Sequence, residues 1–174
     1  MNLSALKSPP FRSYVVSLHL ALNGFWAQRV IIGWLAWEMT GSAGFVGLVA
    51  FLNFFPTLFV SPLFGVFADR IDVRKGSILS YALAGILSAL FAGLCIFGSP
   101  TPILLALFSL VTGVISSANH PMRMSLTPRL APAGDLPSVV AITSLNFNMS
   151  RLTGPAIGGI LIQTIGAPLA FAVT

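Results

Sequence analysis

Charged residues are scarce in this sequence. Four acidic and nine basic side chains make up 7% of its 174 residues, against about a quarter in an average soluble domain. Hydrophobic residues make up 56%, and the mean hydropathy is +0.92. A soluble domain of this length has to cover its surface with polar groups. The scarcity of charge therefore argues against water as the solvent for most of this surface and favours a membrane protein.

Other residue types and patterns are also scarce or lacking, which argues against further classes of protein. The single cysteine, Cys95, lies inside an apolar run, so neither a disulfide framework nor a metal-binding spacing is expected. The sequence has no paired carboxylates, no histidine-rich metal set and no nucleophile with a base at a plausible spacing, so we expect no enzyme, no metal and no cofactor. The formal net charge of +5 comes from scattered basic residues, which gives nucleic-acid binding no support.

Long apolar runs dominate what remains. Five runs cover residues 14–37, 45–67, 77–97, 102–119 and 138–164, and a sixth begins near Pro168. Each of the five is close to the roughly 20 residues that a helix needs to cross a bilayer, whereas barrel strands would alternate over about ten residues. The sequence predicts an all-α fold, a polytopic membrane helical bundle with five full spans and the start of a sixth.

The basic residues predict the orientation of this bundle. They fall before the first run and in every second connection, at Lys7, Arg12, Arg70, Arg74, Lys75, Arg123 and Arg129, while the opposite connections carry none. Loops rich in lysine and arginine stay in the cytoplasm. We therefore expect a multi-pass protein of the cell membrane with a cytoplasmic amino terminus.

The sixth run is cut short. The chain stops at Thr174, after a segment that covers about a third of a 30 Å hydrocarbon core at 1.5 Å per residue. Carbonyl groups ending there would be unpaired in lipid. We expect a truncated or partial chain, or one that docks on a missing partner.

The connection after the second run contains a glycine, an Asp-Arg pair and a late basic pair. These residues are Gly65, Asp69, Arg70, Arg74 and Lys75. The pattern resembles the signature loop of the major facilitator superfamily, although Asp72 and Val73 stand where that family usually has glycine and arginine. The resemblance implies a cytoplasmic latch, in which a carboxylate faces the positive amino terminus of another helix. The alternative is a solvated loop whose cations only fix topology.

The fifth run contains a second pattern, Gly154-Pro155-x-x-Gly158-Gly159. It resembles the Gly-Pro-x-x-Gly-Gly motif that accompanies exporters in the same superfamily. Ser150, Gly154 and Gly158 also form a ridge of small residues that allows two membrane helices to pack backbone to backbone. Ordinary helix packing without a transport role is the alternative interpretation.

A third family motif is missing, because Ser109 stands where an arginine precedes the glycine of the fourth helix, here Gly113. A family-style arginine relay for protons is therefore not expected. From about Ala27 onward the chain is most similar to the enterobactin-exporter-like group of the drug-and-siderophore exporter branch. This resemblance implies that 1–174 is the amino-terminal half of a transporter of the prokaryotic cytoplasmic membrane. Its two inverted three-helix repeats would cover about 1–98 and 99–174, the second incomplete.

Polar side chains inside the apolar runs predict a cavity. The candidates are Asn23, Arg29, Asn119, Asn148 and Arg151. An arginine at a helix centre costs about 2.5–3.5 kcal/mol, so each should face a partner or a polar cavity. No acidic residue occupies a midplane position, which favours an anionic or acidic substrate, or a carboxylate supplied by the missing half. Alternatively, Arg29 snorkels outward and Arg151 caps carbonyls loosened by Pro155.

Together these features predict secondary active transport, with efflux of a small organic molecule by alternating access. The expected partners are the lipid bilayer, the missing carboxyl-terminal half, a small-molecule substrate and protons. A non-transporting membrane scaffold or an inactive transporter fragment is the alternative. We expect the chain alone not to transport, because half a cavity exposes its polar stripes to lipid. His19 and His120 are expected to be structural.

Overall fold

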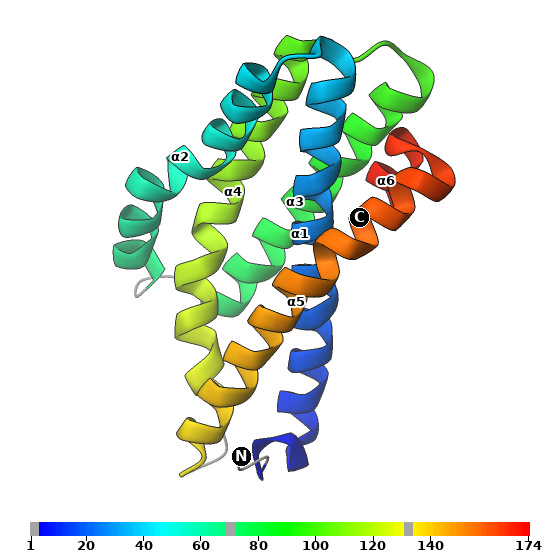
Figure 1. The fold of residues 1–174 in the computed structure, drawn as a ribbon. Helices are drawn as coiled ribbons and strands as arrows, with labels where there is room; N and C mark the ends of the chain where they lie inside the picture. Colours follow the sequence, from blue (N-terminus) through cyan, green and yellow to red (C-terminus); the bar gives the residue numbers. More distant parts are fainter. Residues whose placement is uncertain (1–3, 69–71, 131–133) are drawn as a thin grey trace.

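A computed structural model describes residues 4–68, 72–130 and 134–174. The part of the chain that it describes is helical and contains no strand, which confirms the all-α prediction. The elements are a short 3-10 helix η1 (Ser4–Lys7) and the α-helices α1 (Pro9–Thr40), α2 (Ala43–Ala68), α3 (Val73–Phe97), α4 (Pro102–Arg129), α5 (Leu136–Ile165) and α6 (Ala167–Val173). Figure 1 shows them as a bundle of long helices.

Local chemistry explains where these helices begin and end. Asp72 caps α3, accepting hydrogen bonds from the backbone amides of Arg74 and Lys75 at 3.0 and 3.3 Å. Thr101 caps α4 in the same way, because short polar side chains satisfy the free amides of a first turn. Gly41 ends α1 at φ 60°, a left-handed conformation that glycine adopts without strain.

Four helices, α1 to α4, are long and apolar enough to cross a membrane. The protein is therefore a multi-pass membrane protein. The fifth expected span, α5, has 30 residues but carries a series of polar side chains between 143 and 153 and is not among the four.

The helices extend beyond the apolar runs that predicted them. α1 starts at Pro9 and α4 continues past Pro121 to Arg129, where the sequence predicted ends at 14 and 119. Hydropathy marks only the lipid-facing part of a helix, and helical hydrogen bonding continues into the polar flanks. Pro121 does not end α4, since membrane helices tolerate proline where neighbours satisfy the freed carbonyls.

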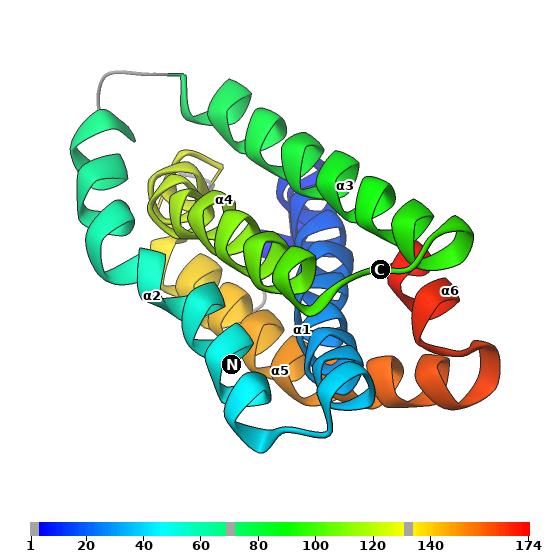
Figure 2. The ribbon, with the colours of Figure 1, turned by 90° about the horizontal axis from the view of Figure 1, so that it is seen from above.

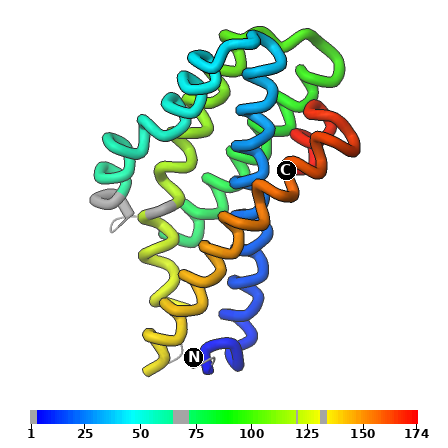
Figure 3. Tube along the Cα trace, viewed as in Figure 1, coloured from blue at the N-terminus to red at the C-terminus, as the bar shows by residue number. Residues whose placement is uncertain are grey.

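Two crossed helix pairs form the frame of the bundle. α1 packs mainly on α5 and α2 mainly on α4, as the trace in Figure 3 shows. Both pairs contain glycines at close approach: a Cβ atom on Gly113 would lie 2.5 Å from the backbone oxygen of Asn53, and one on Gly158 would lie 2.8 Å from that of Ala27. From above, α1 and α4 occupy the centre, with α3 on one side and α2 and α5 on the other (Figure 2).

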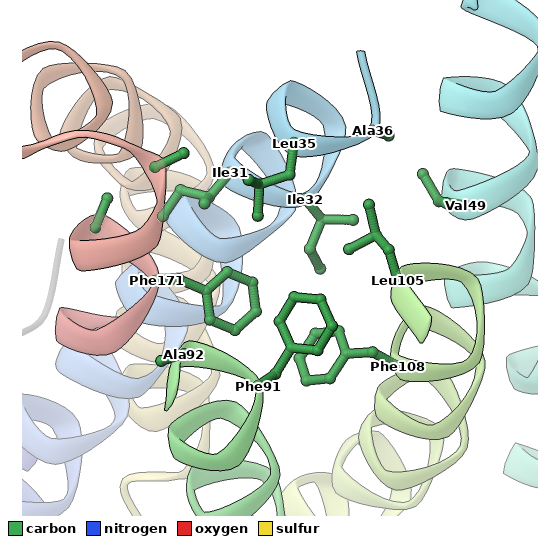
Figure 4. Close-up of a cluster of buried hydrophobic side chains, with 12 residues drawn as sticks. Ile31, Ile32, Leu35, Ala36, Val49, Phe91, Ala92, Leu105, Phe108 and Phe171 are labelled. Atoms are coloured by element: carbon green, nitrogen blue, oxygen red, sulfur yellow. The ribbon is translucent and has the colours of Figure 1, made fainter. Parts of the chain in front are cut away.

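The main apolar core lies away from the amino terminus, where α1, α3, α4 and α6 meet. Its centre is a group of three rings, Phe91, Phe108 and Phe171, whose centroids are 4.5 to 5.2 Å apart (Figure 4). Many large apolar side chains elsewhere point outward, such as Leu58 at 71% exposure. Lipid is the natural environment for such a surface.

Candidate functional site

A cavity of about 220 Å³ lies between α1, α2, α4 and α5, with one side chain from α3. We call it the inner cavity. Its aromatic lining residues are Phe25, Trp26, Phe54, Tyr81 and Phe147. Two arginines, Arg29 and Arg123, join these rings. The lining is therefore aromatic and cationic.

Arg29 lies among three of the rings. Its guanidinium carbon is 3.7 Å from the ring centroid of Phe54, 4.3 Å from that of Phe25 and 5.1 Å from that of Trp26. Each ring face attracts the cation by about 0.5–2 kcal/mol. The Nε atom is nevertheless buried without a hydrogen-bond partner. The side chain is thus held against aromatic walls with one donor unpaired.

Arg123 is the second cation. Its guanidinium carbon lies 5.1 Å from the ring centroid of Phe147. It lines the inner cavity, a groove between α4 and α5, and a larger cavity between α1, α3 and α4. The sequence indicated Arg123 only as a cation that fixes topology, so its position at the inner cavity was missed.

Among the described residues, no carboxylate lines the inner cavity. The acidic residues that the structure describes lie at helix ends: Glu38 in the last turn of α1, Asp72 at the start of α3 and Asp135 before α5. Asp135 accepts a hydrogen bond of 2.5 Å from Ser4, and Asp72 caps α3. Arg29 and Arg123 therefore have no acidic partner within the described residues, and the cavity is complementary to an anion.

Asn23 lies outside the cavity, in a buried polar network between α1 and α5. Its Oδ1 accepts a 2.6 Å hydrogen bond from Thr153, and its Nδ2 lies 3.1 Å from Nε2 of His19 and 3.3 Å from Ser150. Nδ1 of His19 lies 2.6 Å from Oδ1 of Asn146. Nδ1 as donor and Nε2 as acceptor is the assignment of His19 that fits these contacts. The network joins the helix pair.

The other candidate residues do not all lie at the same site. Asn119 lines the inner cavity and accepts a hydrogen bond from Ser80. Asn148 is exposed in the groove between α4 and α5 and donates to the carbonyl of Ser144 at 2.9 Å. Arg151 is exposed, 5.5 Å from the Trp26 ring. The structure thus brings Arg29 and Asn119 to one cavity and leaves Asn23, Asn148 and Arg151 outside it.

The residues of the glycine-proline motif in α5 differ in how they pack. Gly154 and Gly158 are buried against α1, and a Cβ on Gly154 would lie 2.6 Å from that of Trp26. Pro155 lies inside α5, half-buried. Gly159 is exposed with open space around it. Only part of the motif serves the contact of α1 with α5.

The expected latch is only partly visible. Asp69 and Arg70, with the surroundings of Gly65, lie outside the described residues. Arg74 and Lys75 are exposed in the first turn of α3. Arg74 also lines the larger cavity beside α1 and α4. No group of three metal-ligating side chains occurs in the described ranges.

Known proteins resemble this chain along its whole length. The staphyloferrin A transporter of Staphylococcus aureus is 26% identical over 158 residues, which cover 89% of this chain and 39% of that protein. The enterobactin exporter EntS of Shigella boydii is 32% identical over 173 residues, covering 95% and 40%. EntS of Escherichia coli O127:H6 is 32% identical over 183 residues, with the same coverage.

The chain spans about two fifths of the length of these curated relatives. No solved structure matches it significantly. The family model for transmembrane secretion effectors, a major facilitator group, matches residues 1–174. This match agrees with the membrane-length helices, the crossed helix pairs and the arginine-bearing cavity. The chain therefore belongs to the transmembrane secretion effector family of the major facilitator superfamily.

Proposed function

We propose that the full-length protein exports a small organic anion by secondary active transport with alternating access. The observation that carries this proposal is the inner cavity, where two arginines face aromatic rings and no described carboxylate joins them. The family, and the functions for which the relatives are named, support export of a small molecule. They point to a transporter rather than an enzyme.

The chemistry of the cavity favours an anion over a neutral cargo. A guanidinium offers a fork of N–H donors that matches carboxylate and other oxyanions. Aromatic walls exclude water, so the attraction between opposite charges is stronger there than at an exposed site. The Nε atom of Arg29 is buried without a hydrogen-bond partner among the described residues, so the pairing of this cation is incomplete within them.

The frame of the bundle suits alternating access. Close glycine contacts and the His19 network join α1 to α5, and Asn53 joins α2 to α4. Such pairs move as one body when one half of a transporter rocks against the other around a central site. We place the site between this half and the rest of the protein, with the amino terminus in the cytoplasm and the protein in a bacterial cytoplasmic membrane.

Proton coupling would need a carboxylate from elsewhere. No acidic residue that the structure describes lies in the middle of a helix. We propose that a proton-carrying group, if protons drive export, belongs to the part of the protein outside this chain. Enterobactin and staphyloferrin A, named for its relatives, are the first cargo candidates to test.

The test is efflux by the full-length protein in cells that lack their own exporter for the chosen cargo. Arg29→Gln and Arg123→Gln each remove one cation from the inner cavity. We expect either change to reduce efflux about tenfold, the factor that corresponds to a lost charge-assisted hydrogen bond of about 1.5 kcal/mol. Arg29→Lys keeps the charge and should retain part of the activity.

Arg12→Gln is the matched control, because Arg12 is exposed on α1 and does not line the inner cavity. Like each cavity variant, it removes one positive charge, but it should leave efflux unchanged. Efflux that survives both cavity changes, or falls equally in the control, would contradict the proposed site.

A further inference from the structure

A second cavity is larger than the inner one. It has a volume of about 700 Å³, and the described residues that line it come from α1, α3 and α4, with Leu130 at the end of α4. We call it the lateral cavity. It extends from Pro10 and Leu130, near the end of the bundle that holds the amino terminus, to Ala21 and Asn119. In Figure 1 this end is opposite the α1–α2 and α3–α4 connections. Its volume lies within the range of ligand pockets, about 300–1,000 Å³.

Two arginines, Arg74 and Arg123, supply the charge of the lateral cavity, and none of the described residues that line it is a carboxylate. The carboxylate nearest to Arg74 in sequence, Asp72, accepts its hydrogen bonds from backbone amides at the start of α3. No ion pair involving either arginine occurs in the described part of the chain. The cavity is therefore cationic, with hydroxyl groups such as those of Ser13, Ser17 and Ser77 as further donors.

One wall of the lateral cavity continues into an apolar outer surface. Ile78 and Tyr81 line the cavity and are also 61% and 40% exposed. Leu79, beside them on α3, is 60% exposed. In a multi-pass membrane protein such a surface faces acyl chains. The cavity thus presents cations inside and an apolar helix face at its mouth, a combination that matches an amphiphile better than a soluble ion.

We propose that the lateral cavity binds an anionic phospholipid of the cytoplasmic leaflet. Its phosphodiester group would contact Arg74 and Arg123, and an acyl chain would follow the exposed face of α3. Guanidinium groups bind phosphate oxygens through paired N–H donors. Basic pockets between membrane helices on the cytoplasmic side are a recognised type of lipid headgroup site. Lys7, Arg12 and Arg129 lie at the helix ends on this side of the bundle, which the positive-inside rule assigns to the cytoplasm.

The two cavities are contiguous. Ala21, Tyr81, Asn119 and Arg123 line both of them. A lipid held in the lateral cavity would therefore lie directly beside the inner cavity. This role goes beyond export itself, although the shared Arg123 links the two cavities.

The test uses the full-length protein with two lipids of identical acyl chains, palmitoyl-oleoyl-phosphatidylglycerol and palmitoyl-oleoyl-phosphatidylcholine, in equal amounts. Native mass spectrometry then measures the ratio of the two retained lipids. We expect the anionic lipid to be preferred, and Arg74→Gln to lower that preference about fivefold, the effect of one cation near a membrane surface. Arg74 is exposed and lies outside the inner cavity, so the variant should fold and its result does not depend on cargo binding.

Arg129→Gln is the control, since Arg129 is an exposed cation at the end of α4 that does not line the lateral cavity. It should leave the ratio of retained lipids unchanged. Equal retention of the two lipids, or an equal loss in the control, would overturn the proposal in favour of a non-specific annulus. Displacement of the bound lipid by glycerol 3-phosphate alone would overturn it in favour of a soluble anion.

Discussion

Arg29 and its rings show what the sequence could and could not predict at the scale of single residues. An arginine inside an apolar run has to find a partner or a cavity, and that rule alone indicated Arg29. The rings that hold it, Phe25 and Phe54, could not be recognised, because the chain has fourteen phenylalanines in similar runs. Arg123 was undervalued because an arginine close to a helix end also fits a purely topological role.

The glycines of α5 allow a matched pair of changes. Gly154→Ala places a methyl group 2.6 Å from the Cβ of Trp26, a contact that requires the backbones of α1 and α5 to separate. We expect a loss of about 1–3 kcal/mol of stability, typical of overpacking. Thermal unfolding in detergent measures it. Gly159→Ala enters open space and should be neutral; equal effects would refute the packing argument.

Asp69 carries the latch prediction, although it lies outside the described residues. Asp69→Lys reverses the charge that is expected to face the positive end of a helix. Flux through the full-length protein should then fall to background in a transport assay, while expression stays normal. Glu38→Lys, an exposed acid at the far end of α1, is the control. Undiminished flux in the Asp69 variant would mean that the loop is passive.

At the scale of elements, hydropathy located the α-helices of the described residues, but neither the residues at which they end nor the helices that they contact. The central parts of α1 to α5 coincide with the five apolar runs, while η1 and the extensions of α1 and α4 consist of residues with no apolar pattern. The pairing of α1 with α5 could be anticipated only from the ridge at Ser150, Gly154 and Gly158. No comparable sequence pattern predicted the contact of α2 with α4.

Asn53 provides the polar contact of that second pair. Its Nδ2 donates to the carbonyl of Ser109 at 3.2 Å and lies 3.1 Å from Oγ1 of Thr112, while its Oδ1 has no partner. Since hydrogen bonds between membrane helices average about 0.6 kcal/mol, Asn53→Ala should destabilise the fold only modestly. Denaturant unfolding measures the change. Asn148→Ala, which removes a bond within one helix, is the comparison; a smaller loss for Asn53 would contradict the assignment.

At the scale of the whole molecule, composition and charge distribution specified the solvent and the class. A bundle that turns apolar side chains outward needs lipid, and this followed from scarce charge alone. The sequence predicted a cavity but neither its full lining nor the second, lateral cavity, because these depend on how the helices pack against one another. Sequence periodicity does not determine such angles.

Orientation in the membrane remains a prediction that labelling can decide. In a Cys95→Ala background, single cysteines replace Arg12, Arg129, Ser42 or Thr101, all of which are exposed. An impermeant maleimide applied to intact cells should label the positions at 42 and 101 and reach 12 and 129 only after permeabilisation, because cationic ends stay inside. Labelling of position 12 together with position 42 in intact cells would refute this topology.

Arg123 borders both cavities, and this sharing has a thermodynamic consequence. One guanidinium cannot give its full set of donors to two anions at once, so headgroup and cargo affinities become linked. By reciprocity, whatever factor the lipid imposes on cargo affinity, the cargo imposes on lipid affinity. Under these proposals, the phospholipid composition of the host cell would act as an effector of export.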